Sequence, residues 1–590
     1  ILAQTGKTNG TKSTYVPPYC GFFGCYDGGT YDLPYFFGGG DVSVVNSGNI
    51  TITTDLTHPL GYLNYRASIG IAATTDLCGS PYPWLDASVC GGDISVLNSG
   101  ELNITNTGSG GAVGIAGYTG GISSGNVYVG NSGEMNILGT EFATGIAVVT
   151  DTGDVYIKNS ADITTTTNTA GREGRATGIR IVSNNASNIT VLNSGEIVSN
   201  GDIAASGINA NSRGGDVSVE STGNITTEST DYYTLYSYYR GGYYAVGGNA
   251  SGIRANTVYA GNSSVINEGN VEVYGVINAY GIITNAKDSN SYTKNTGNIR
   301  VSNGDNNYAG NVYGIIAQAS GFSDFFYGGN DGYTTVLNSG AITANGTELA
   351  VAIKATQVYG AITIENSGEI VADSTNRAAR GILTTNVYGS TNILNTGNIT
   401  VTGPGSAVAI SAYSTGCCNA NYYGDIYVAS SGNLTASSEY NRASGIEAQS
   451  TYGSIDILTY GTIEATAYER AFGIDARTVY GEISIENHAN VSADSSTEFA
   501  VGIRAQSNYG DISITNYADV SASGYSLTQG IVALSYYGNA FIINNGDISA
   551  SSSDGYSQAV ALRSGSGGKY TSALINSGSI SDDGSEYSVA

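Results

Sequence analysis

Methionine, tryptophan and histidine are nearly absent from this chain, which has one Met, one Trp and 2 His among 590 residues. The two histidines, His58 and His488, lie far apart, so a Ser-His or Cys-His catalytic pair is not expected. Acidic pairs such as Asp41 and Asp93 occupy Gly-Asp turn positions, where a turn-forming role explains them better than glycoside hydrolysis. We therefore expect no enzyme, no catalytic residue, no cofactor and no metal site.

Basic residues are also scarce. The chain has 22 Lys and Arg against 48 Asp and Glu, a net charge of -26. Nucleic acids and anionic membrane surfaces are bound through clustered Lys and Arg, so neither is an expected partner. No apolar run approaches the roughly 20 residues of a membrane span, and no signal-peptide pattern is present. We expect no membrane insertion, and a chain that is either already processed or a segment of something longer.

Six cysteines fall into three local groups, and no histidine stands near them to complete a zinc site. An even number of cysteines predicts disulfides and therefore an oxidising, extracellular setting, with metal ligation as the weaker alternative. The connectivity stays open, because pairing within a group and pairing between groups both fit. The candidate disulfide residues are Cys20, Cys25, Cys78, Cys90, Cys417 and Cys418.

Glycine (84) and tyrosine (45) are abundant, and Asn, Ser, Thr, Ala, Ile and Val dominate the rest of the chain. β-Branched residues and glycine disfavour helices and favour short strands joined by turns. The composition is uniform from end to end. We therefore expect an all-β fold that runs over residues 1–590 without separate domains.

An internal repeat determines the expected fold. The motif G-[DNES]-[IV]-x-[IV]-x-N-[ST]-G-x-[IV]-x-[AV] recurs, as in "GDISVLNSGELNI" (92–104), and is followed by A-x-G-I-x-A, as in "ASGIEAQ" (443–449). Its marker glycines Gly340, Gly368 and Gly397 are 28 and 29 residues apart. About 17 copies with a basic period of about 28 residues predict the successive turns of a solenoid.

Each copy contains three apolar stretches of period two, which predict three strands with one side inside and the other in solvent. Stacked copies then form a parallel three-sided β-solenoid, or β-helix, of about 17 coils. Asparagines at one turn position are expected to form an inward hydrogen-bonded ladder, and tyrosines before the first strand to stack along an outer edge. The asparagines are Asn46, Asn98, Asn131, Asn159, Asn193, Asn338, Asn366 and Asn395, and the tyrosines are Tyr359, Tyr388, Tyr423, Tyr452, Tyr480, Tyr509 and Tyr537.

Insertions interrupt this single continuous solenoid at its corners. Four of them follow the third strand of a copy and contain all six cysteines: residues 6–39, 74–91, 319–332 and 413–423. A fifth insertion, residues 228–244, leaves from a different corner and is rich in tyrosine.

The two ends of the chain resemble two parts of one coil. "SEYSVA" (585–590) followed by "ILAQT" (1–5) matches "TEFAVGIRAQS" (497–507) position for position. Neither end shows the cap that solenoid monomers use to cover unpaired strand edges, and a head-to-tail contact of this kind generates filaments. The residues expected at such a subunit junction are Ile1, Leu2, Ala3, Gln4, Glu586, Tyr587, Val589 and Ala590.

The alternation of "GDISVLNSGEL" with "ASGIEA" over nearly the whole chain resembles the repeat regions of bacterial autotransporter passengers and related secreted β-solenoid surface proteins. The resemblance implies a β-helical protein that is exported and displayed outside the cell, often as an adhesin. Passengers of that family are joined to a C-terminal membrane domain of alternating strands, and we find no segment like it in these residues.

These observations predict a structural subunit of an extracellular filament at the cell surface, in which residues 1–5 complete the last coil of the preceding copy. The expected partner is the chain itself, with glycans or a cell surface as further candidates. Two alternatives remain: a monomeric adhesin passenger of the autotransporter type, and a segment of a giant repetitive surface protein. N-x-[ST] motifs at the start of second strands give solvent-facing candidate glycosylation sites at Asn49, Asn224, Asn398 and Asn433.

Overall fold

The computed structural model describes residues 14–16, 19–21, 24–26, 29–31, 41–54, 67–75, 92–108, 110–119, 125–168, 174–237, 242–304, 310–320, 332–416, 424–565, 569–585 and 587–589. Within residues 14–31, 233–246 and 587–589 only the backbone is described. Every secondary-structure element assigned in these residues is a β-strand, which confirms the all-β prediction. No helix long and apolar enough to cross a membrane occurs in the part of the chain that is described.

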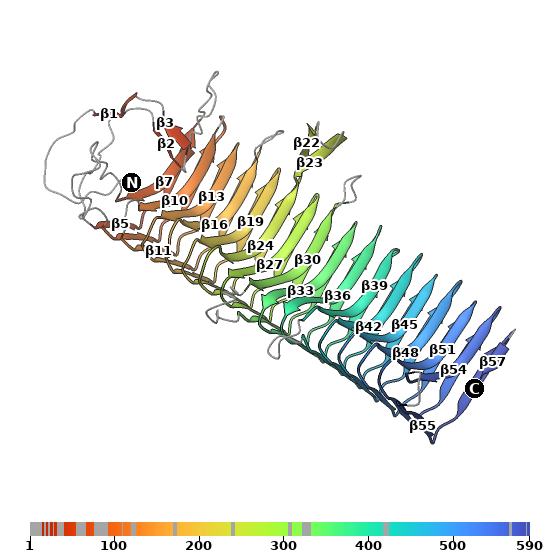
Figure 1. The fold of residues 1–590 in the computed structure, drawn as a ribbon. Helices are drawn as coiled ribbons and strands as arrows, with labels where there is room; N and C mark the ends of the chain where they lie inside the picture. The colour runs from red at the N-terminus through yellow and green to blue at the C-terminus, as the bar shows by residue number, and fades with distance from the viewer. Residues whose placement is uncertain are drawn as a thin grey trace. The chain divides into compact units, whose positions relative to one another are not determined.

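The chain divides into two compact units, and each is described by itself. The first is Ile1–Lys287 with Asn306–Tyr308, and the second is Asp288–Asp305 with Ala309–Ala590. Within each unit the chain coils through three strands per turn, and equivalent strands of successive coils pair in parallel (Figure 1). This arrangement confirms the predicted three-sided parallel β-solenoid. We call the resulting sheets the first, second and third sheet, in the order in which one coil visits them.

The first unit has seven strands in each sheet among its described residues. Its first sheet contains β5 (Val42–Asn46), β8 (Ile94–Asn98), β11 (Val127–Asn131), β14 (Val155–Asn159), β17 (Ile189–Asn193), β20 (Val217–Ser221) and β25 (Ser263–Asn267). Its second sheet contains β6 (Ile50–Thr54), β9 (Leu102–Asn106), β12 (Met135–Gly139), β15 (Ile163–Thr167), β18 (Ile197–Gly201), β21 (Ile225–Ser229) and β26 (Val271–Gly275). Its third sheet contains β7 (Ala67–Thr74), β10 (Gly111–Thr119), β13 (Phe142–Thr150), β16 (Arg175–Ser183), β19 (Ala204–Ser212), β24 (Asn249–Thr257) and β27 (Asn278–Lys287).

The second unit has ten strands in each sheet among its described residues. Its first sheet contains β28 (Ser291–Asn295), β31 (Thr334–Asn338), β34 (Ile362–Asn366), β37 (Thr391–Asn395), β40 (Ile426–Ser430), β43 (Ile455–Thr459), β46 (Ile483–Asn487), β49 (Ile512–Asn516), β52 (Ala540–Asn544) and β55 (Ser572–Asn576). Its second sheet contains β29 (Ile299–Asn303), β32 (Ile342–Gly346), β35 (Ile370–Ser374), β38 (Ile399–Thr402), β41 (Leu434–Ser438), β44 (Ile463–Ala467), β47 (Val491–Ser495), β50 (Val520–Gly524), β53 (Ile548–Ser552) and β56 (Ile580–Gly584). Its third sheet contains β30 (Asn311–Ser320), β33 (Leu349–Tyr359), β36 (Ala378–Tyr388), β39 (Ser406–Ser414), β42 (Arg442–Ser450), β45 (Arg470–Thr478), β48 (Phe499–Ser507), β51 (Leu527–Ser535), β54 (Tyr556–Arg563) and β57 (Tyr587–Val589).

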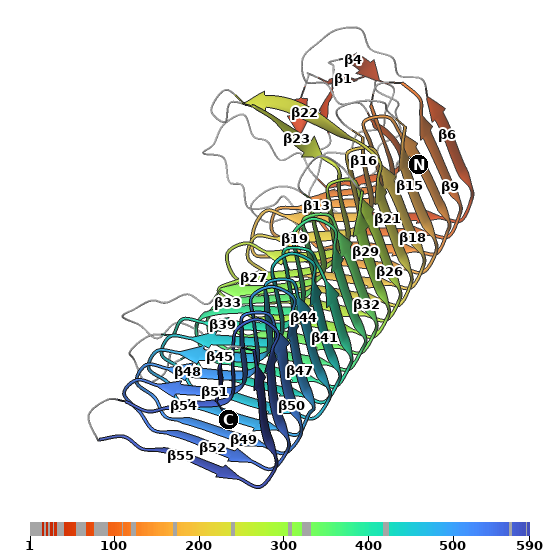
Figure 2. The same ribbon diagram turned by 90° about the vertical axis from the view of Figure 1, so that its right-hand side faces the viewer.

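The core consists of columns of Ile, Val and Ala inside the coils. In the first and second sheets every other side chain is buried, as the period-two pattern predicts. Figure 2 shows strands of the second sheet lying side by side, among them β41, β44, β47 and β50. Ile463 of β44 is paired with Val491 of β47, which is paired with Val520 of β50, and all three are almost fully buried. The same kind of contact therefore recurs in coil after coil.

The third strand of most coils is longer than the first and second strands, and in most copies a glycine interrupts its pairing in the middle. In β45, Gly473 separates two paired halves of the strand and is itself left out of the register. A Cβ at this position would collide with Cγ1 of Val491 in the second sheet and lie 2.5 Å from the carbonyl oxygen of Gly502. Glycine at 473 therefore fits the close approach of β45 to the second sheet, while the equivalent position holds Ala352, Ala409 and Ala559 in β33, β39 and β54.

Two of the predicted insertions contain strands in the described residues. Residues 6–39 include β1 (Thr14–Val16), β2 (Tyr19–Gly21), β3 (Gly24–Tyr26) and β4 (Gly29–Tyr31), which pair antiparallel as β1 with β4 and β2 with β3. The tyrosine-rich insertion forms an antiparallel hairpin of β22 (Tyr232–Ser237) and β23 (Gly242–Gly247), so it extends three residues beyond the predicted end at residue 244. The other insertions, 74–91, 319–332 and 413–423, lie largely outside the described residues.

Candidate functional site: ladders, stacking faces and outer surface

The predicted asparagine column forms a hydrogen-bonded ladder inside the first sheet. In the first unit, from Asn46 to Asn193, each side-chain nitrogen donates to the side-chain oxygen of the next asparagine at 2.8 Å. In the second unit the same 2.8 Å contacts run from Asn295 to Asn395. Each nitrogen also donates to the carbonyl oxygen two residues further along its own turn. The ladder prediction is confirmed.

Hydroxyl side chains occupy three places in this column. Asn193 donates to Ser221 Oγ and Asn395 to Ser430 Oγ, both at 3.1 Å. The Thr459 hydroxyl donates to Asn487 at 2.6 Å, and the amide ladder then continues from Asn487 to Asn576. Every one of these amide groups donates toward the C-terminal end of its unit, so the ladder has a direction.

A second ladder lies at the solvent-facing turn before the first strand. The Oδ1 atom of Asp41 accepts the backbone N–H of Asp93 at 3.0 Å, and Asp93 in turn accepts the N–H of Asn126 at 2.7 Å. Asp511 and Asn539 of the second unit act in the same way. These carboxylates therefore join successive coils.

The predicted tyrosine stack is present wherever its members are described. Tyr452, Tyr480, Tyr509 and Tyr537 form one row with ring centroids 4.9 to 5.1 Å apart, and Tyr359 stacks on Tyr388 at 4.9 Å. Tyr423 lies outside the described residues. A further row that the sequence did not indicate places His488 between Tyr460 and Tyr517, with centroids 4.8 and 4.4 Å away.

The last coil of the second unit leaves inward-pointing side chains uncovered. Leu574 of β55 is in register with Ile542 of β52, which is fully buried, yet Leu574 is 40% exposed. Asn576 accepts the ladder hydrogen bond from Asn544, and among the described residues its own nitrogen donates only to Gly578. Among the described residues, nothing covers the apolar column or continues the amide ladder beyond this coil.

The predicted junction is described only in part. Ile1, Leu2, Ala3, Gln4, Glu586 and Ala590 lie outside the described residues. In β57, the backbone of Tyr587 pairs with Tyr556, which leads through Leu527 to Phe499. Val589 pairs with Gln558, which pairs with Gln529, which pairs with Val501. Tyr587 and Val589 thus stand in the register that the sequence alignment assigns to them.

The candidate disulfide residues are also described in part. Cys20 of β2 and Cys25 of β3 occupy directly opposite positions of an antiparallel pair. Cys78, Cys90, Cys417 and Cys418 lie outside the described residues. The backbone register therefore favours local pairing of the first two cysteines, and the disulfides themselves remain a prediction.

The candidate glycosylation sites face solvent, as expected. Asn49, Asn224, Asn398 and Asn433 are all exposed. Their Oδ1 atoms accept the backbone N–H of the equivalent residue in the next coil, as Asn398 does from Asn433 at 3.0 Å. Inter-coil bonding explains why asparagine is used here, and glycosylation of the side-chain nitrogen remains a prediction.

The sequence did not reveal a charged cluster on the outer side of the third sheet in the second unit. Asp475 of β45 is fully buried and receives hydrogen bonds from three arginines on three adjacent strands: Arg442 at 2.7 Å, Arg477 at 2.8 and 3.0 Å, and Arg504 at 2.8 Å for both contacts. Burial raises the pKa of the Asp475 carboxyl, and Arg477 and Arg442 act in the opposite direction.

The side chains around Asp475 show why it is buried although it points outward. Arg442, five residues before Glu447 on the same strand, donates to that carboxylate at 3.0 Å. The guanidinium groups of Arg442 and Arg504 lie 4.7 and 4.1 Å from the ring centroid of Phe472. Side chains from both halves of the strand therefore converge on Asp475 and cover it.

One signal in the sequence points to this cluster. The variable position of G-I-x-A holds Glu447, Asp475 and Arg504 in three consecutive copies, opposite charges at adjacent places. In the described residues no group of three or more His, Cys, Asp or Glu side chains is arranged to hold a metal ion. No family model, no curated protein and no solved structure matches the chain.

Proposed function

We propose that the protein is a structural subunit of an extracellular filament, in which copies stack head to tail so that the solenoid continues from one copy to the next. The open face of the last coil carries the proposal. Leu574 stands in a column that is buried in every covered coil above it, so leaving it exposed costs apolar burial that a further coil would restore.

The directional ladders support this proposal. Asn576 retains donor capacity toward a next coil, and at the start of the first unit no ladder donor to the Asn46 Oδ1 atom is found among the described residues. Stacking one copy on another pairs these two groups and extends the strand pairing across the joint. The register of Tyr587 and Val589 agrees with residues 1–5 supplying the rest of that strand.

Substitutions at the open face test the proposal. Leu574→Asp places a charge in the apolar column at the joint, and we expect electron microscopy to show single rods in place of filaments. Ile543→Asp is the matched control, because Ile543 is 38% exposed and points outward from the preceding coil. Filaments that form equally well with Leu574→Asp, or wild-type preparations that contain only isolated rods, contradict head-to-tail stacking.

Two other functions fit some of the same observations. The open face suits equally well the next coil of one giant repetitive surface protein. The mass of denatured, reduced native material distinguishes the two: a value near 60.4 kDa plus any glycans indicates subunits, and a far larger value indicates the giant chain. The β22–β23 hairpin projects from the repeat and favours an autotransporter-type adhesin, for which deletion of residues 232–247 abolishes attachment to cells or glycans.

An extracellular location is part of the proposal. It is supported by the opposed positions of Cys20 and Cys25 and by the exposed N-x-[ST] asparagines. Peptide mapping of native material before and after reduction tests it. A free thiol at both Cys20 and Cys25 would contradict an oxidising location.

A further inference from the structure

The outward side of the third sheet in the second unit is basic, although the whole chain has a net charge of -26. Among the described residues its outward positions carry two acidic side chains, Glu447 and Asp475, against seven basic ones. The outward positions of the first and second sheets in the same unit carry seven acidic and two basic side chains. The seven basic residues of the third sheet are Lys354, Arg380, Arg442, Arg470, Arg477, Arg504 and Arg563.

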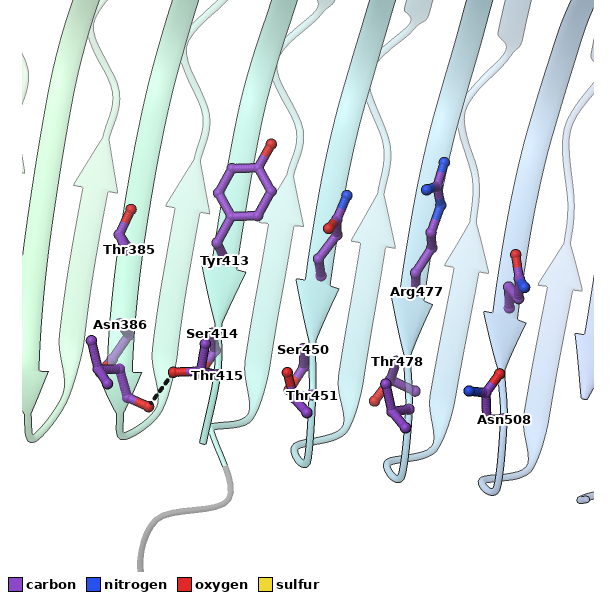
Figure 3. A pocket seen from close by; sticks show the side chains of 14 residues that line it. Thr385, Asn386, Tyr413, Ser414, Thr415, Ser450, Thr451, Arg477, Thr478 and Asn508 are labelled. Carbon is purple, nitrogen blue, oxygen red and sulfur yellow. Dashed lines mark hydrogen bonds between the residues drawn. The ribbon is translucent and has the colours of Figure 1, made fainter. Parts of the chain in front are cut away.

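A depression of about 460 Å³ lies on this basic side, near the C-terminal ends of its strands. It extends across β36, β39, β42, β45 and β48, and its lining side chains repeat from strand to strand along the sheet (Figure 3). Tyr413, Gln449, Arg477 and Gln506 occupy the same register position of four consecutive strands. The depression is therefore elongated across the strands, in the direction in which the coils stack.

The guanidinium of Arg477 is fixed in an orientation in which one of its edges can bind an anion. Its Nε and Nη2 atoms donate to the two carboxylate oxygens of Asp475 at 3.0 and 2.8 Å, which fixes the plane of the guanidinium. Among the described residues its Nη1 atom has no partner, and the side chain is 38% exposed. A fixed guanidinium with a free edge loses little conformational entropy when it binds a carboxylate.

Neutral hydrogen-bonding groups flank this arginine on both sides. Gln449 donates to Glu447 at 2.8 Å and keeps its carbonyl oxygen available. The amide of Gln506 has no hydrogen-bond partner among the described residues, and it lines the depression. Amide groups placed in a row on either side of a cation suit a ligand with several hydroxyl groups as well as a negative charge.

The two carboxylates nearby are each paired with arginine, which offsets their repulsion of an anionic ligand. Glu447 and Asp475 have side chains that are 5% and 0% exposed, and they lie below the guanidinium groups. Arg442, Arg477 and Arg504 outnumber them, so the surface presented to solvent is positive. A basic site on an otherwise acidic molecule favours anionic ligands.

We propose that this depression binds a linear acidic polysaccharide, a chain of sugars that carry carboxylate groups, lying across the strands. Coils repeat at about 4.8 Å, which is comparable to the length of one sugar residue in an extended chain. A sugar carboxylate binds Arg477 Nη1, sugar hydroxyls bond to Gln449 and Gln506, and the Tyr413 ring gives one sugar ring an aromatic contact. This inference does not depend on the proposed filament.

Affinity electrophoresis of the full chain tests the proposal, with polygalacturonate in the gel as the acidic probe and dextran as the neutral one. We expect polygalacturonate to retard the protein and dextran to leave its mobility unchanged. Arg477→Gln weakens the retardation about tenfold or more, because a charge-assisted hydrogen bond is lost. Gln506→Ala keeps every charge and removes no hydrogen bond from the described fold, and it weakens binding by a smaller factor.

Arg470→Gln is the matched control. It removes one positive charge from the outward side at the opposite end of the same strand, where Arg470 pairs with the exposed Glu498 at 2.8 Å. We expect its retardation to stay within about twofold of wild type, as for an exposed ion pair outside the site. Equal losses in Arg470→Gln and Arg477→Gln, unchanged binding in both Arg477→Gln and Gln506→Ala, or no retardation by polygalacturonate overturn the proposal.

Discussion

Arg442 and Asp475 lie on adjacent strands of the third sheet and meet at 2.7 Å between Nη2 and Oδ2, with the carboxylate fully buried. Arg477 and Arg504 bind the same carboxylate, so one buried negative charge holds three guanidinium groups from β42, β45 and β48. The group of charges spans three coils. It therefore adds an electrostatic coupling between these coils to the contacts that the apolar columns already make.

Removing this negative charge leaves the three arginines close together without their common partner. We expect Asp475→Asn to lower the free energy of unfolding by about 3–5 kcal/mol, as for a buried ion pair broken on one side. Urea unfolding followed by circular dichroism measures the loss. Glu498→Gln is the control, because its pair with Arg470 is about half exposed and contributes at most about 1 kcal/mol. Equal effects of the two substitutions would show that the cluster does not stabilise the coils.

The asparagine ladder makes a second prediction. In Asn366→Ala, the side-chain nitrogen of Asn338 loses its acceptor, and the side-chain oxygen of Asn395 and the carbonyl oxygen of Gly368 lose their donor. Each buried group left unsatisfied costs about 1–3 kcal/mol, and hydrogen exchange of nearby backbone amides reports the loss. Asn366→Ser is the matched variant, since Ser430 already fills this position in the same column. We expect Asn366→Ser to lose less than half as much stability as Asn366→Ala. Equal losses in the two variants would contradict a hydrogen-bonded role.

The central glycines of the third strands make a third prediction. Gly473→Ala forces a Cβ against Val491 and the Gly502 carbonyl, and overpacking of this kind costs about 1–3 kcal/mol or more. Gly214 provides the control because a Cβ built there meets its nearest described neighbours at 3.4 Å or more, which is ordinary van der Waals contact. We expect Gly214→Ala to leave the melting temperature within about 2 °C of wild type and Gly473→Ala to lower it clearly. A neutral Gly473→Ala would mean that the two sheets can separate at little cost.

The sequence predicts the ladders but not the charged cluster, and the reason is physical. Asn98 and its equivalents recur at one turn position, and stacking identical coils places identical groups next to one another, so period alone is sufficient to predict their contact. Period two assigns Glu447 and Asp475 to the outer side of the strand, where side chains are normally exposed. Their burial depends on the arginine side chains that cover them from the same and neighbouring strands, which alternation of apolar residues does not encode.

The same distinction applies to the ends and the insertions. The alignment of Tyr587 with Phe499 follows from the repeat and agrees with the backbone register. The hairpin of β22 and β23 has no counterpart in other copies, so its end at Gly247 was not predictable from the period. Repetition thus specifies the coil, and only individual contacts specify what interrupts it.

The exposed turn of the last coils makes a prediction about pH. Hydrogen bonds from the side chain and backbone of Ser579 lower the pKa of the Asp547 carboxyl, and the Ser579 N–H lies 2.9 Å from Oδ1. Because the pKa in the folded state is below its unfolded value, this contact stabilises the turn at neutral pH, and the contribution is lost as pH falls through the folded pKa. Asp547→Asn keeps an oxygen acceptor and does not titrate, so we expect protection of the Ser579 amide to fall on acidification in wild type but not in the variant. The Thr571 amide, which donates to the neutral Asn539 at 2.9 Å, serves as the internal control and should not change between the two proteins. Equal loss of Ser579 protection in Asp547→Asn would mean that acid acts elsewhere in the coil.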